Sequence, residues 1–130
     1  MSQADADVVT KFLNAFTTGQ LETATSLLHR DIVISEAEGL PYPGDHVGLA
    51  GFQNLLGKMF EPFEMTVHDF EVTDAGSIVV VKLLMEFKSR ASGRTVAMPS
   101  VELYTVSDGL VSKIDVYYKD SKAIADLVSG

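Results

Sequence analysis

The chain has 130 residues, of which 46% are hydrophobic, so it fits one compact domain that spans residues 1–130. Its formal net charge of -8 disfavours contact with nucleic acid and with an anionic membrane surface. The chain has no cysteine, and its three histidines are too far apart for zinc-type ligand spacing, so we expect no disulfide, metal or cofactor. The start is polar and acidic, and no apolar run approaches the roughly 20 residues that span a bilayer. We therefore expect a cytoplasmic protein.

The first third of the chain leads to a carboxylate. Apolar residues at helical spacing predict a helix over residues 8–16 and a second helix over residues 21–28, with a Thr-Thr-Gly break between them. The β-branched Ile-Val-Ile run then predicts a strand over residues 31–35. Glu36 follows at the end of this strand, beneath two helices. It is a candidate acid or base, although a solvated Glu at a strand end is the common alternative.

The rest of the chain predicts a loop, a helix and a sheet. Residues 39–48, GLPYPGDHVG, hold two prolines and three glycines and predict a loop that can act as a lid. A third amphipathic helix is expected over residues 49–60. The strand-like runs that follow are separated by turn residues at 74–76, 92–93 and 108–109, which predicts an antiparallel meander before a short helix over residues 120–128. The expected class is α+β, with helices gathered on one face of a strongly bent antiparallel sheet.

Strand alternation sorts the sheet residues onto two faces. The residues expected to face the helices are Val81, Leu83, Met85, Phe87, Val101, Leu103, Ile114, Val116 and Tyr118. The outer face is expected to hold Lys82, Leu84, Glu86, Lys88, Glu102, Tyr104, Lys113, Asp115 and Tyr117. Aromatic and apolar residues among charges on that outer face suit a homodimer.

Three motifs carry a resemblance to a known superfamily. They are VVxxFLxAFxxG(QLETATSLL)xxD(IVIS)E at residues 8–36, PYPGxHxGxxGF at residues 41–52 and SDGLVxxIxVYY at residues 107–118. In these motifs and in element order, nearly the whole chain resembles the nuclear transport factor 2-like superfamily, and it looks closest to the SnoaL-like polyketide cyclases. The resemblance implies a cone-shaped sheet with three N-terminal helices on its concave face and a pocket between them. It leaves the chemistry open, because the superfamily also holds ketosteroid isomerase, limonene-epoxide hydrolase, scytalone dehydratase and non-catalytic binding modules.

The resemblance also implies positions for site residues. Glu36 falls where ketosteroid isomerase keeps the carboxylate that moves a proton beside a carbonyl. The phenol and the neutral carboxylic acid of that isomerase would fall at Phe12 and Val101, so both stabilisers are missing and a steroid isomerase is disfavoured. The last-strand carboxylate of the cyclases and of the epoxide hydrolase falls at Val116, or at Asp115 if a β-bulge shifts the alternation.

Two ligand-binding hypotheses follow, beside a third in which the protein only associates through the outer face of its sheet, which leaves the pocket residues unexplained. The first is a cofactor-independent cyclase or isomerase that binds a small hydrophobic carbonyl compound and uses Glu36 as general base, with Tyr118, Tyr42 or His46 donating a hydrogen bond to the developing oxyanion. The second is a binding or sensing module with the same apolar pocket and no chemistry, in which Tyr42 packs a turn, His46 caps a loop and Tyr118 bonds a backbone carbonyl. In both, the ligand is expected to contact Phe12, Phe16, Tyr42, Phe52, Leu56, Met85, Val101, Leu103 and Val116.

Overall fold

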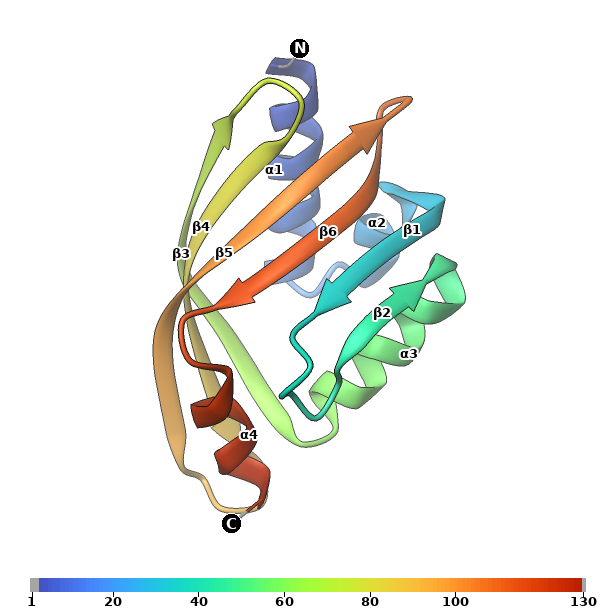
Figure 1. Ribbon diagram of the computed structural model, residues 1–130. Coiled ribbons are helices and arrows are strands. Elements are labelled where there is room, and N and C mark those ends of the chain that lie inside the picture. Colours follow the sequence, from blue (N-terminus) through green and yellow to red (C-terminus); the bar gives the residue numbers. More distant parts are fainter. Residues whose placement is uncertain (1–2, 130) are drawn as a thin grey trace.

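The fold is a single six-stranded sheet that curves around helices, as the computed structural model of residues 3–129 shows (Figure 1). The strands lie in the order β2-β1-β6-β5-β4-β3. The element bounds are α1 Gln3–Thr17, α2 Leu21–Ser26, β1 Leu28–Glu36, β2 Gly44–Val47, α3 Gly48–Phe60, β3 Phe63–Asp74, β4 Val79–Ser89, β5 Thr95–Ser107, β6 Leu110–Tyr118 and α4 Ser121–Ser129.

The helices overlap their predicted ranges, although α1 begins at Gln3 rather than at residue 8 and α2 ends at Ser26 rather than at residue 28. The long helix α1 ends at Thr17, and Gly19 follows with a φ of +77°, a left-handed conformation that glycine adopts without a steric penalty. In Figure 1, α1, α2 and α3 lie on the concave side of the sheet, and α4 lies at the opposite end of the molecule from the N-terminus, where it contacts β4 and β5. Asp120 caps the N-terminus of α4, because its side-chain Oδ1 accepts a hydrogen bond from the backbone N–H of Ala123 at 3.0 Å. No helix within residues 3–129 has the length and apolar character needed to cross a membrane.

The meander of the second half is confirmed. Strands β3, β4, β5 and β6 pair with one another in antiparallel register. The hairpin between β5 and β6 turns at Asp108 and Gly109, whose φ values of +55° and +77° match the two-residue turn that an Asp-Gly pair predicts.

The first strand differs from the prediction in two ways. Residues 39–48 were expected to form a loop, but Gly44–Val47 in fact form β2, which pairs antiparallel with the last residues of β1. In addition, β1 runs parallel to β6, so the sheet is mixed. Strand β1 also begins at Leu28, earlier than predicted, and it lies inside the sheet, where β2 and β6 supply backbone partners to its two edges.

The alternation predicted for β4 and β6 is confirmed, but that for β5 is wrong. Residues Val81, Leu83, Met85 and Phe87 are at most 6% exposed, while Lys82 and Lys88 are exposed. In β5, Glu102 lies directly opposite the inward Val81, and Val101 lies opposite the outward Lys82. Because directly paired residues share a face, Glu102 faces the helices and Val101 faces away.

The observed register of β5 also reverses the predicted faces of Leu103 and Tyr104. Tyr104, expected on the outer face, is 1% exposed, and its ring centroid lies 6.1 Å from that of Phe12. Leu103, in contrast, lies on the outer face beside Asp115. The alternative that a bulge turns Asp115 inward is wrong, because the irregularity between β5 and β6 falls at Thr105 and Val106. The Asp115 carboxylate instead accepts a hydrogen bond from the exposed Tyr117.

Candidate functional site

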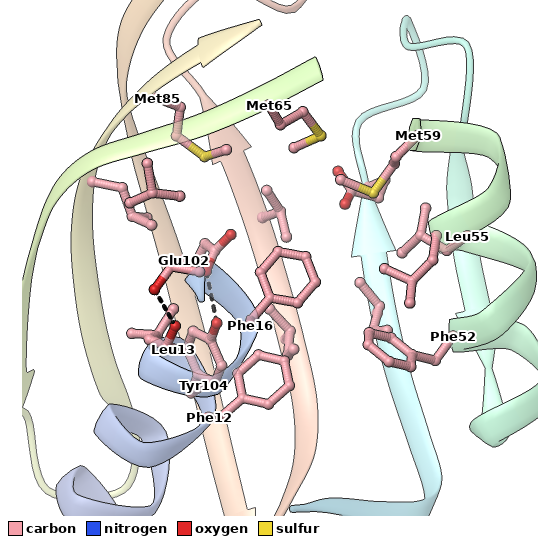
Figure 2. A pocket seen from close by; sticks show the side chains of 18 of the residues that line it. Phe12, Leu13, Phe16, Phe52, Leu55, Met59, Met65, Met85, Glu102 and Tyr104 are labelled. Atoms are coloured by element: carbon pink, nitrogen blue, oxygen red, sulfur yellow. Dashed lines mark hydrogen bonds between the residues drawn. The ribbon is translucent and has the colours of Figure 1, made fainter. Parts of the chain in front are cut away.

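A cavity of about 60 Å³ lies between α1, α3 and the concave face of the sheet (Figure 2). Its walls are mostly apolar. The rings of Phe12 and Phe16 are stacked with their centroids 5.9 Å apart, and the ring centroid of Phe52 lies 6.5 Å from that of Phe12. The space holds a few water molecules, so a larger ligand enters only if side chains move. Methionines suit that movement because their thioethers adapt to irregular shapes. The described lining residues are Phe12, Leu13, Phe16, Thr17, Ile34, Glu36, Phe52, Leu55, Leu56, Met59, Met65, Val67, Leu83, Met85, Glu102, Tyr104, Ile114, Val116 and Tyr118.

Glu36 is the buried carboxyl group of this cavity. It is the last residue of β1 and is 6% exposed, and its Oε1 has no hydrogen-bond partner within residues 3–129. The pKa of Glu36 is raised from 4.5 to about 8, mainly by burial and in smaller part by the charge of Glu102, while a hydrogen bond from the Tyr118 hydroxyl partly opposes both. No described ion pair includes this carboxyl group. Glu36 is therefore held mostly protonated at neutral pH.

A second carboxyl group, Glu102, lines the same cavity. The Tyr104 hydroxyl donates a hydrogen bond to Glu102 Oε1 at 2.7 Å, and Figure 2 shows both side chains among the residues that line the cavity. Burial raises the pKa of Glu102, and the hydrogen bond from Tyr104 acts in the opposite direction. Since each carboxyl group disfavours ionisation of the other, the two titrate as a pair.

Sequence reasoning placed Glu102 on the outer face of the sheet and so missed this group. The apolar side chains at positions 101 and 103 made the wrong face of β5 look like the core. A usable signal lay in the hairpin register, since counting back from the turn at 92–93 pairs position 102 with an inward residue of β4.

Tyr118 lines the cavity from β6, and Tyr42 lies behind it. The Tyr42 hydroxyl donates to the Tyr118 hydroxyl at 3.2 Å, and Tyr42 itself is fully buried and does not line the cavity. Burial raises the pKa of Tyr118 well above its ordinary value, with further increases from the nearby acidic groups. Tyr118 therefore stays protonated and can donate a hydrogen bond into the cavity.

Three of the other predicted contacts lie elsewhere. His46, on β2, is buried with its Nε2 at 3.2 Å from the Tyr42 carbonyl oxygen and does not line the cavity, because the unpredicted strand β2 turns it toward the loop. Val101 and Leu103 lie on the outer face of β5, for the reason of register given above. The structure brings together at the cavity the remaining predicted residues, namely Glu36, Tyr118, Phe12, Phe16, Phe52, Leu56, Met85 and Val116.

The chain is an α+β domain whose curved sheet and helices enclose a mostly apolar cavity lined by two carboxyl groups. Residues 9–114 match the family of SnoaL-like domains, and the chain belongs to that family, within the nuclear transport factor 2-like superfamily. No curated protein matches the chain in sequence.

Solved structures share the fold over nearly the whole chain. TerC, co-crystallised with polyporic acid, has a TM-score of 0.86 and 21% identity, over 98% of this chain and 99% of its own. A nuclear transport factor 2-like protein of Burkholderia xenovorans LB400 has a TM-score of 0.87 and 25% identity, over 99% and 98% of the two chains. A candidate polyketide cyclase of Xanthomonas campestris pv. campestris has a TM-score of 0.81 and 21% identity, over 96% and 97%.

Proposed function

We propose that this protein catalyses cofactor-independent proton transfer on a small, uncharged, hydrophobic carbonyl compound, as a cyclase or isomerase. The observation that supports it most is the state of Glu36: a buried carboxyl group with one unpartnered oxygen and a pKa of about 8 lines an apolar cavity. A carboxylate with a raised pKa is a stronger base than an ordinary one. The family and its cyclase neighbours support the class of reaction.

In this mechanism the two carboxyl groups have different tasks. Ionised Glu36 accepts a proton from the carbon next to the carbonyl, and the electron pair moves to the carbonyl oxygen. The protonated form of Glu102 is the hydrogen-bond donor at the cavity for that developing negative charge, and the Tyr118 hydroxyl, which bonds the Glu36 carboxylate, becomes a second donor as Glu36 takes up the proton. Tyr104 orients Glu102 through its 2.7 Å hydrogen bond. Glu36 then returns the proton to another carbon or to the same one, so the protein ends the cycle unchanged.

The second candidate is a ligand-binding or sensing module. The apolar side chain of Phe12 favours it, because ketosteroid isomerase keeps at that position the phenol that stabilises the developing oxyanion. This module would use the same contacts and leave the protons of the ligand in place.

Proton exchange distinguishes the two without knowledge of the natural substrate. We expect the protein to accelerate the replacement of α-hydrogens by deuterium in 2-indanone, a small neutral ketone, dissolved in D₂O and followed by NMR. Acceleration should grow as the pH rises through about 8, where Glu36 ionises. Binding of 2-indanone with exchange no faster than in protein-free buffer would favour the binding module.

The homodimer and the cytoplasmic location also remain proposals. Leu84 and Tyr117 are 43% and 54% exposed on the outer face of the sheet, among lysine and acidic side chains that a two-fold related copy can match with opposite charges. Analytical ultracentrifugation should give twice the 14.1 kDa chain mass, and Tyr117→Asp should lower it to one chain. A parent protein that sediments at 14.1 kDa at high concentration would exclude the dimer.

A further inference from the structure

The cavity carries acidic side chains and no basic ones. Two carboxyl groups, Glu36 and Glu102, line it, and none of its described lining residues is Lys, Arg or His. The Glu36 side chain is more than nine-tenths buried, and its Oε1 is an acceptor without a donor among residues 3–129. A buried acceptor left without a partner costs stability, and a ligand with N–H donors would supply one.

Aromatic rings surround these two carboxyl groups. The lining includes the rings of Phe12, Phe16, Phe52, Tyr104 and Tyr118. The face of an aromatic ring attracts a cation, and this attraction grows when water is excluded. An anionic ligand would instead meet the negative faces of the rings and the acidic groups together. The described lining therefore discriminates ligands by charge.

We propose that the cavity binds a primary amine with a small hydrophobic tail, as its ammonium ion, between Glu36 and Glu102. The ammonium group has three N–H donors, which match the unpartnered Oε1 of Glu36 and the Glu102 carboxyl group. The hydrophobic tail would lie against the phenylalanine rings. This inference uses the cavity of the proposed function but not its chemistry, because an amine can bind without turnover and a ketone can react where no amine binds.

Binding of a cation must move a proton. Glu36 is mostly protonated at neutral pH in the free protein, whereas an ammonium ion is best paired with a carboxylate. Glu36 therefore gives its proton to solvent when the ammonium ion enters, and the ammonium ion keeps its own protons. The other titratable groups that face Glu36 are Glu102, Tyr118, Tyr42 and Tyr104, while the lining residues of α1 and α3 do not ionise. Tyrosines whose pKa is raised stay neutral, so the released proton comes from the carboxyl pair.

Three ligands that share a benzene ring but are positively charged, neutral or negatively charged test this proposal on the unmodified protein. In isothermal titration calorimetry at pH 7, benzylamine should bind at least about tenfold more tightly than benzyl alcohol, and benzoate should not bind. Repeating the titration in two buffers of different ionisation enthalpy should show release of about one proton per bound benzylamine, and none for benzyl alcohol. Benzyl alcohol binding as tightly as benzylamine, or benzylamine binding without proton release, would overturn the proposal.

Matched variants show which carboxyl groups bind the ammonium ion. Glu36→Gln should bring the affinity for benzylamine down to that for benzyl alcohol, and Glu102→Gln should weaken it as well. Glu38→Gln removes an exposed carboxyl group two residues away and should leave binding unchanged. Thermal melting of each variant checks its folding. Equal benzylamine affinity in the parent and in a folded Glu36→Gln variant would contradict a site at this carboxyl group, whether or not the ketone exchange experiment succeeds.

Discussion

Glu36→Gln is expected to stabilise the protein progressively as the pH rises from about 4.5 to about 8. In the folded parent the pKa of Glu36 is about 8, while in the unfolded chain it returns to about 4.5. Between these values the folded state binds more protons than the unfolded state, so the stability of the parent falls as pH rises. Glutamine keeps the shape of the side chain and does not ionise. The free energy of unfolding of the variant should therefore exceed that of the parent by about 3 kcal/mol at pH 7. This difference should level off at about 5 kcal/mol above pH 8.

Urea unfolding of the parent and the variant at several pH values measures this gain. Below about pH 4.5 both side chains are neutral, so the difference there gives the baseline for exchanging an acid for an amide. Glu38→Gln is the matched control, because this side chain is exposed and its removal should leave the pH dependence unchanged. A constant difference between the parent and Glu36→Gln from pH 4 to pH 9 would mean that Glu36 is ionised in the folded state by partners that offset its burial.

Glu36→Gln is also expected to reduce α-hydrogen exchange of 2-indanone by a factor on the order of a hundred to ten thousand. The amide cannot accept a proton from carbon, while the apolar wall that holds the ketone is unchanged. In the parent the rate should rise with pH to a plateau above about 8, as Glu36 ionises. In the variant that dependence should be lost.

Glu38→Gln again serves as control and should keep the full exchange rate and its pH profile. Affinity for 2-indanone, measured separately, should change little in Glu36→Gln, because the carboxylate of Glu36 accepts the α-proton and does not bind the ring of the ketone. A variant that binds 2-indanone and exchanges its hydrogens as fast as the parent would exclude Glu36 as the base.

The sequence predicted much of this architecture because its patterns are local. Helical spacing located α1 and α3, and the Asp-Gly turn located the hairpin of β5 and β6. The raised pKa of Glu36 was also predictable, since an acid at a strand end under two apolar helices with no nearby cation must lose hydration. The parallel pairing of β1 with β6 was not, because it joins segments about eighty residues apart that share no local signal.

The second carboxyl group was missed for a physical reason. In β5, apolar side chains occur on both faces, so hydrophobicity alone cannot choose which face is buried. The choice rests on hydrogen-bonded register with β4, which places Glu102 inward at the cost of burying a polar group. Functional sites commonly break local rules in this way, and here the exception is a residue that lines the cavity.

The protonation of Glu36 can be measured directly by NMR titration of side-chain carboxyl carbons in ¹³C-glutamate-labelled protein, with Glu36→Gln identifying the signal. The expected midpoint is about 8. It should fall in Glu102→Gln, which removes the neighbouring negative charge, and rise in Tyr118→Phe, which removes the hydrogen bond that favours the carboxylate. A midpoint near 4.5 in the parent, unmoved by either variant, would contradict the account of Glu36 as a buried, mostly protonated carboxyl group coupled to Glu102.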